Sequence, residues 1–229
     1  DVQEPSISKG LYFSSPNFHD EIRFAGIPPF HLCVDQLNTT SDECQALLVC
    51  VTKNTTQSQL VTEMIDSQRI LETSDTFDTV EHFVRGDCNA IVGGVVEIAQ
   101  ENILNLGYTG EYAVGPTAYS RESLALVTTE EDIVWSNFVN WIVMATIYAE
   151  EENITSSTFQ KMPRVDLFQP LVNDGMFRNV IRAVGSYAEI WDRATARQSL
   201  QRKGRNLLNS LPRLGPQLYS DLLWDTRRS

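Results

Sequence analysis

The chain has 229 residues, 42 % of them hydrophobic, with 18 basic and 30 acidic side chains. This length is sufficient for one large or two small domains with a buried core, and the net charge of −12 argues against nucleic acid as a partner. The longest apolar stretch, Ile133 to Ala149, is interrupted by polar residues, so we expect no membrane span. The first residues lack the basic and apolar regions of a signal peptide, which predicts a chain that is either mature or not exported.

Strand and helix patterns alternate over the first 130 residues, after a polar, turn-rich segment at residues 1–20. The expected strands are Glu21–Ile27, Ala46–Thr52, Arg69–Glu72, Cys88–Val92, Tyr112–Val114 and Ser123–Thr128, and the expected helices are Thr55–Asp66, 75–84 and Val95–Asn105. Ser74 or Asp75 can cap the second of these helices, and Gly86 can end it. Strands separated by helices of about ten residues predict βαβ units and a largely parallel sheet.

The remainder of the chain predicts helices at residues 131–151, 155–160 and 174–194, with one or two more before the end. In the first of these, apolar residues recur at helical spacing and form a wide apolar face. We interpret Trp135 and Trp141 on this face as core residues. Residues 161–229 also contain 12 of the 18 basic side chains, which we interpret as a solvated helix face that complements the acidic remainder.

Four cysteines, Cys33, Cys44, Cys50 and Cys88, form an even set without C-x-x-C spacing, so a zinc site is poorly supported. The sequence alone does not choose among the three possible pairings. Cys50 and Cys88 both lie in expected strands; if these strands are neighbours, Cys50–Cys88 is possible, and Cys33–Cys44 then closes a short loop. Four reduced core thiols are the alternative.

Three N-x-S/T sequons begin at Asn38, Asn54 and Asn153. Together with the even number of cysteines, they favour a secreted glycoprotein in the extracellular space or another oxidising compartment.

No catalytic or metal-binding motif is found. His19, His31 and His82 have no ligand partners at metal spacing, and Gly93-Gly94 is too short for a dinucleotide-binding motif, although it could expose helix amides to an anion. The sequence therefore supports neither an enzyme nor a bound cofactor.

Several segments resemble the amino-acid-binding proteins of bacterial ABC importers, the type II (family 3) solute-binding proteins, and in particular their polar or general amino-acid branch. GLYFSSPNFHD (Gly10–Asp20) is similar to the F-S-x-P-Y-Y turn of that family. LLVCVTKNTTQSQL (Leu47–Leu60) and FVRGDCNAIVGG (Phe83–Gly94) are similar to V-C-V-Q-x-G-T-T and G-R-C-D-A-x-T-T-D, and VGSYAEIWDR (Val184–Arg193) is similar to V-G-N-Y-G-E-I-Y-E-R. With Ser120–Thr155, these segments extend over most of the chain in the order that the family shows.

The resemblance implies an α/β fold of the periplasmic-binding-protein type, in which a ligand lies between two lobes. Residues 31–122 would form a complete βαβ lobe two. Residues 1–30 and 123–229 would form an incomplete, helix-rich remnant of lobe one. The matching cysteines also support Cys50–Cys88 as a pair.

The resemblance also implies what is missing. The family has further strands of lobe one, and an arginine that binds the ligand carboxylate, before the F-S-x-P turn, and this chain begins only a few residues before that turn. The family aspartate that binds the ligand ammonium group falls on Gly94. Thr55 and Thr56 remain as anion-directed residues at the start of a helix, with Arg121 as a further candidate contact. Asn54 stands where the family has glycine, and a glycan there would obstruct the cleft.

Two functional hypotheses follow. The first, which we favour, is a non-catalytic secreted protein on a scaffold that has lost amino-acid binding and that acts through assembly with a protein partner or a second copy. The second is a module that binds an amino-acid-like or anionic small molecule after another chain has completed the first lobe.

Overall fold

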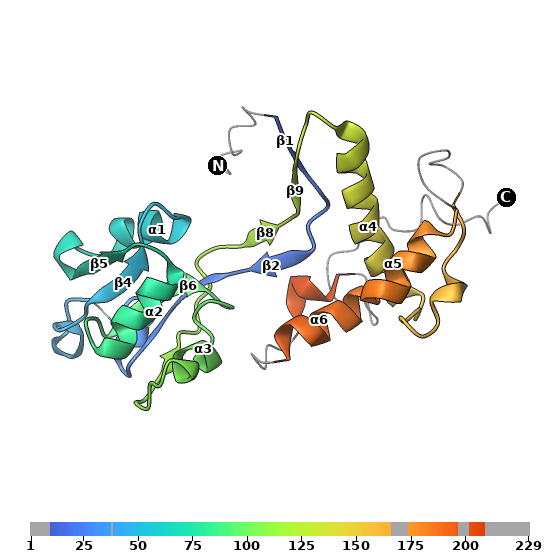
Figure 1. Cartoon of the computed structure of the whole chain (residues 1–229). Coiled ribbons are helices and arrows are strands. Elements are labelled where there is room, and N and C mark those ends of the chain that lie inside the picture. Colours follow the sequence, from blue (N-terminus) through green and yellow to red (C-terminus); the bar gives the residue numbers. More distant parts are fainter. Residues whose placement is uncertain (1–9, 38, 166–173, 197–201, 209–229) are drawn as a thin grey trace. The chain divides into compact units, whose positions relative to one another are not determined.

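The computed structural model describes residues 10–37, 39–165, 174–196 and 202–208. These residues divide into two compact units (Figure 1). The sheet unit contains residues 20–122, and the helical unit contains residues 10–19 and the described part of residues 123–208. Within these ranges, no helix has the length and apolar character needed to span a membrane.

The sheet unit is a five-stranded sheet with strand order β5-β4-β6-β3-β7. Its strands are β3 (Ile22–Gly26), β4 (Val49–Thr52), β5 (Ile70–Thr73), β6 (Ala90–Gly94) and β7 (Ala113–Val114), and its helices are α1 (Thr56–Met64), α2 (Thr76–Arg85) and α3 (Gln100–Asn105). Strand β4 is parallel to β5 and β6. The sequence-based division at residue 31 assigned β3 to the other lobe, whereas β3 lies in this sheet beside β6.

Strand β3 runs antiparallel to both β6 and β7, so the prediction of a largely parallel sheet was wrong for this strand. A parallel connection between neighbouring strands requires a long crossover, usually a helix. Among the described residues between β3 and β4, the only helices are the short 3-10 helices Phe30–Leu32 and Asp42–Cys44, and the chain enters the parallel part of the sheet in the opposite direction.

Alternation along the strands divides the core of the sheet unit into two layers. Val49 and Val51 of β4 face a cluster that includes Val61 of α1, whereas Cys50 faces a cluster that includes Phe83 of α2 and Ile103 of α3. Because successive side chains of a strand point to opposite faces, α1 covers one face, and α2 and α3 cover the other.

The helices of the sheet unit begin and end at capping residues. Thr55 is the N-cap of α1 and forms a capping box with Ser58, while Asp75 caps α2. Gly86 ends α2 with a φ of +84°, a conformation that glycine adopts without steric cost.

Helix α3 is shorter than the expected Val95–Asn105. It starts at Gln100, and residues 95–98 form a turn. Asn102 closes this turn by donating hydrogen bonds from its side-chain amide to the carbonyl oxygens of Val96 and Glu97.

Two disulfides join the four cysteines of the sheet unit. Cys33 is bonded to Cys44 over a sequence separation of 11 residues, and Cys50 is bonded to Cys88 over 38 residues. All four cysteines are buried. The second disulfide links β4 to the residues that lead directly into β6.

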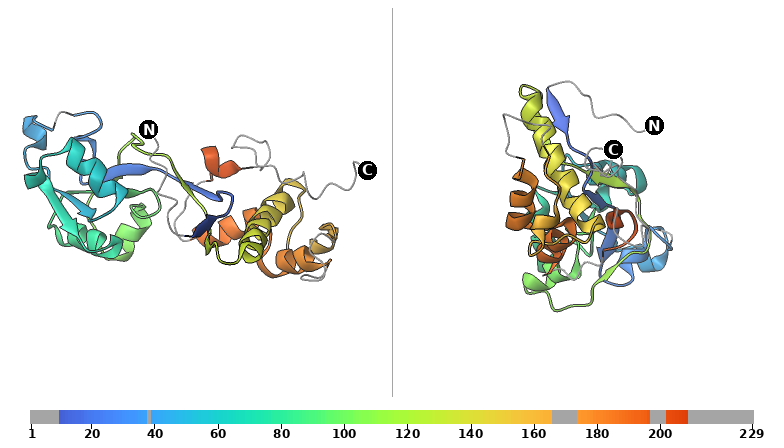
Figure 2. Two further views of the ribbon diagram at one scale, coloured as in Figure 1. Left: turned by 90° about the horizontal axis from the view of Figure 1, so that it is seen from above. Right: turned by 90° about the vertical axis from the view of Figure 1, so that its right-hand side faces the viewer.

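In its described residues, the helical unit contains short strands and three α-helices. Strands β1 (Leu11–Phe13) and β9 (Val127–Thr129) pair with each other, and the helices are α4 (Ile133–Glu151), α5 (Met176–Val184) and α6 (Tyr187–Thr195). Strands β2 (Phe18–Asp20) and β8 (Glu122–Leu124) also pair, and their residues Asp20 and Glu122 belong to the sheet unit. Helix α4 packs against α5 and α6 (Figures 1 and 2). Short 3-10 helices occur at Phe159–Lys161 and Gly204–Leu207.

The structure corrects several expectations for this unit. The turn-rich N-terminal segment contains β1 and β2, and the expected strand Ser123–Thr128 is divided between β8 and β9. The expected helix at 174–194 is two helices, because Gly185 interrupts it with a φ of +83°. Residues 155–160 form only a short 3-10 helix, and the further helices expected before the end fall mostly outside the described residues.

The prediction that Trp135 is a core residue was also wrong. The residue is 53 % exposed at the start of α4, and its ring stacks on Phe138. Trp141, one and a half turns further along the helix, packs at the edge of the buried cluster that α4 forms with Phe177 and Ile181 of α5. The apolar face of α4 is therefore covered only in its C-terminal part.

Polar contacts hold the helical unit together at α6. Ser186 and Glu189 form a capping box, and the Glu189 carboxylate also accepts hydrogen bonds from the backbone and hydroxyl of Ser156. Burial opposes ionisation of Glu189, but these hydrogen bonds outweigh it and lower the pKa of this carboxyl. Arg202 forms a two-pronged ion pair with Glu150 of α4, with N–O distances of 2.5 and 2.9 Å.

Replacement of both cysteines of a disulfide by alanine should cost more for Cys50–Cys88 than for Cys33–Cys44. Loop-closure entropy predicts that the free energy of unfolding falls by about 4 kcal/mol without Cys50–Cys88 and by about 3 kcal/mol without Cys33–Cys44, because Cys50–Cys88 closes the longer loop. Urea unfolding followed by circular dichroism measures both values. Equal midpoints for the two double variants and the unchanged chain would contradict this expectation.

Candidate functional site

The carboxyl ends of β4 and β6 lie beside each other in the sheet unit. The two strands are parallel and aligned with Val49 opposite Ala90, so Thr52 and the Gly93-Gly94 pair leave the sheet at the same edge. Ligands of α/β sheets bind outside this edge. A hollow of about 30 Å³ lies there, lined by both strands and by the first residues of α1 and α2.

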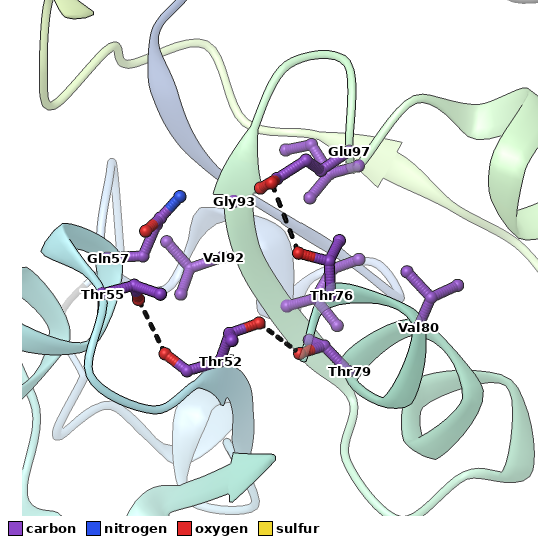
Figure 3. Close-up of a pocket in the computed structure, with 11 residues that line it drawn as sticks. Thr52, Thr55, Gln57, Thr76, Thr79, Val80, Val92, Gly93 and Glu97 are labelled. Carbon is purple, nitrogen blue, oxygen red and sulfur yellow. Dashed lines mark hydrogen bonds between the residues drawn. The ribbon is translucent and has the colours of Figure 1, made fainter. Parts of the chain in front are cut away.

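Four threonines are among the residues that line the hollow, and their hydroxyls form hydrogen bonds with one another, with the backbone and with Glu97 (Figure 3). Thr52 and Thr79 are joined through their hydroxyls at 2.9 Å, and the Thr55 hydroxyl donates to the Thr52 carbonyl at 2.6 Å. The Thr76 hydroxyl donates to Glu97 at 3.3 Å. A hollow of this volume admits water or one terminal group of a ligand; a whole amino acid requires additional surface.

The start of α1 contributes Thr55 and Thr56, the two residues that the sequence analysis selected. The Thr55 hydroxyl accepts from the Ser58 amide at 3.2 Å and is thus engaged in capping. Thr56 is exposed, and its hydroxyl donates to Glu122 at 3.0 Å. Because the first amides of a helix have no partner within the helix, the start of α1 can donate hydrogen bonds to an anionic group.

Two carboxylates surround the Gly93-Gly94 pair, and the sequence analysis identified neither of them. Glu97 accepts the Gly94 amide at 3.0 Å. A Cβ on Gly93 would lie 3.1 Å from Glu97 Oε2 and 2.9 Å from Ile98 Cγ2, and a Cβ on Gly94 would collide with Asp20 Oδ2. Both positions therefore require glycine in the observed structure.

Asp20 reaches this edge because of the register of β3. Ile22 pairs with Gly94 in the antiparallel ladder, so Asp20, two residues before Ile22, lies beside the residues that follow Gly94. Its Oδ1 accepts the Val95 amide at 2.9 Å and the Glu21 amide at 2.8 Å. Burial raises the pKa of Asp20 above its usual value, although these two hydrogen bonds oppose the increase. The family-like segment Gly10–Asp20 ends at this residue, but the resemblance assigned Asp20 no role at the site.

Other residues selected from the sequence lie elsewhere. Arg121 is exposed and does not line the hollow. Asn54 and Asn153 are exposed and have positive φ angles of 59° and 53°, whereas Asn38 lies outside the described residues. Among the residues that the structure describes, no group of three or more His, Cys, Asp or Glu side chains could hold a metal ion.

Searches against known proteins gave consistent matches. No family model matches the chain. Over 224 residues it is 24 % identical to the putative amino-acid ABC transporter-binding protein YhdW of Escherichia coli K12, and equally to YhdW of Escherichia coli O157:H7. Each match covers 88 % of this chain and 63 % of the relative, so the chain spans less than two thirds of the length of these curated relatives.

A similar solved structure is the ABC transporter periplasmic binding protein from Brucella ovis with glutathione bound. It superimposes with a TM-score of 0.71 at 20 % identity, over 93 % of this chain and 71 % of that structure. The homologues of this chain are amino-acid ABC transporter-binding proteins. The resemblance drawn from the sequence motifs and the predicted type II periplasmic-binding-protein fold are thus confirmed.

The homologues are binding proteins rather than enzymes. Such proteins are exported, and the two disulfides fit an oxidising compartment.

Proposed function

We propose that this chain is part of a binding protein for an amino acid or a small amino-acid-like compound, with its site in the sheet unit at the carboxyl ends of β4 and β6. The observation that carries this proposal is the match to YhdW, which extends over 88 % of the chain and is therefore not confined to one motif. The site has the polarity that such a ligand requires: helix amides at the start of α1 for a carboxylate, and carboxylates beside Gly94 for an ammonium group.

This proposal differs in emphasis from the sequence analysis, which favoured assembly without ligand binding. That preference depended on the glycine at position 94 and on the absence of a counterpart of the family arginine. The homologues support the second hypothesis, a small-molecule module, better than the first.

An exposed apolar surface supports completion of the module by further polypeptide. On one face of the β1–β9 pair, Tyr12 and Thr128 contact α4 through hydrogen bonds of 3.1 and 2.6 Å to Asn137 and Ser136. Residues that alternate with these lie on the other face, where Leu11, Phe13 and Val127 are each about half exposed.

The start of α4 adds to the exposed apolar surface of this unit. Ile133, Val134 and Trp135 are 50–54 % exposed. A two-stranded sheet with one bare apolar face is marginally stable, and apolar patches of this kind commonly mark contact sites. A polypeptide that supplies the rest of the lobe, either a separate chain or a second copy, would cover this surface.

Isothermal titration of the full chain with the common amino acids and with glutathione tests the proposed ligand class. At least one of these compounds should bind saturably with a Kd below about 1 mM. Thr76→Val, which removes a hydroxyl that donates to Glu97 at the hollow, should weaken that binding several-fold. Thr62→Val, on the exposed side of α1, is the matched control and should leave the Kd unchanged. Saturable binding that both variants retain at full strength would place the site elsewhere.

Light scattering over a range of protein concentrations tests whether the exposed apolar surface mediates self-association. We expect the chain to show a mass above its own 25.8 kDa as concentration rises, because the bare face of β1–β9 and the start of α4 associate with another copy. The double variant Phe13→Ser/Trp135→Ser should reduce this association. Phe77→Ser, at a residue of the sheet unit that is 64 % exposed, should not. A mass of one chain at every concentration would contradict this part of the proposal.

A further inference from the structure

Asp20 is placed as a ligand-binding carboxylate would be. It is the last residue of β2 and lies two residues before β3, and the antiparallel register of β3 with β6 holds it at the edge where β6 ends. Its Oδ1 is fixed by two backbone amides, those of Glu21 and Val95. The side chain is therefore held in one orientation before any ligand arrives, which lowers the entropic cost of binding.

The second oxygen of this carboxylate is unoccupied. Within the described part of the chain, Oδ2 accepts no hydrogen bond and forms no ion pair, although the group is half-buried. Burial of an ionised carboxylate costs free energy unless a partner compensates it, and the pKa of Asp20 is correspondingly raised. A cation that contacts Oδ2 would supply the missing partner through a charge-assisted hydrogen bond.

Oδ2 also stands in a defined place relative to the hollow. It occupies the space that a side chain at position 94 would need, and Gly93, one residue earlier, lines the hollow together with Thr55. The start of α1 and the Asp20 carboxylate thus lie near the same hollow, one suited to a negative group and the other to a positive group.

We infer that Asp20 determines specificity at the proposed site by receiving the α-ammonium group of the ligand, in place of a side chain at position 94. The inference rests on the proposed function. The Asp20 carboxylate would favour ligands with a free amino group over those whose amino group is acylated or absent. Glu97 cannot take this role as readily, because its two oxygens already accept the Gly94 amide and the Thr76 hydroxyl.

The test titrates the full chain with the L-amino acid that it binds best and with the N-acetyl derivative of that amino acid. Unchanged protein should bind the free amino acid at least 10-fold more tightly than the derivative. Asp20→Asn keeps an acceptor for the Val95 and Glu21 amides but removes the charge, and it should weaken binding of the free amino acid at least 10-fold while leaving binding of the derivative unchanged. Asp42→Asn, an exposed aspartate of the same unit, is the matched control and should behave as the unchanged chain.

A variant in which the carboxylate is moved from position 20 to position 94 tests whether Asp20 has a binding role or only a structural role. In Asp20→Ala/Gly94→Asp, removal of the Asp20 side chain makes room for a Cβ at position 94 and restores a carboxylate close to the same point. This double variant should bind the free amino acid more tightly than Asp20→Ala alone, whereas a purely structural role for Asp20 predicts no recovery. Thermal unfolding followed by circular dichroism shows that each variant is folded.

The outcomes distinguish the two proposals. If the unchanged chain binds amino acids and Asp20→Asn binds them equally well, this inference is overturned and the proposed function stands. If the unchanged, folded chain binds neither the amino acids nor glutathione, both are overturned.

Discussion

The parallel pairing of β4 with β6 is the contact on which the rest of the sheet unit depends. It pairs Val49 with Ala90, two residues that are 41 positions apart in the sequence, and the Cys50–Cys88 disulfide closes the chain across the same pair of strands. Because the strands are parallel, their carboxyl ends emerge side by side. The start of α1 after β4 and the glycine pair at the end of β6 then meet around one hollow.

Position 94 illustrates how tertiary structure can change the chemistry that a motif implies. Taken alone, a glycine there indicates a lost charge. The structure shows that the antiparallel neighbour β3 delivers a different carboxylate, that of Asp20, into the space above Gly94. A carboxylate with one oxygen fixed by backbone amides and the other unoccupied is suited to a cationic group, and this carboxylate supports the proposed site.

Local signals predicted the helices α1 and α2 and the strands between which they lie. The capping threonine Thr55, the capping aspartate Asp75 and the terminal Gly86 act within a few residues, so they can be read directly from the sequence. Strands β1 and β2 could not be read in this way, because their partners β9 and β8 are more than 100 residues away and their own sequences are short. Asp20 was not predicted as a site residue for the same reason, because only the register of β3 with β6 places it beside Gly94.

Trp135 shows a second limit of structure prediction from the sequence. Helical periodicity identifies an apolar face on α4, but it does not reveal whether another element covers that face. The C-terminal part of α4 packs against α5 and α6, whereas its first turn is exposed together with one face of the β1–β9 pair. This difference between covered and uncovered parts of the same helix agrees with a chain that spans only 63 % of the length of its curated relatives.

The account depends most on the location of the ligand at the edge formed by β4 and β6. Amide chemical-shift mapping by NMR during titration with an amino acid measures this location directly. The account predicts that the largest shifts fall on residues 52–58 and 93–97, including the Val95 amide that donates to Asp20. A second hollow of the sheet unit is lined by Phe77 of α2 and by Asn102 of α3. Saturable shifts confined to that hollow, or to the helical unit, would contradict the predicted location.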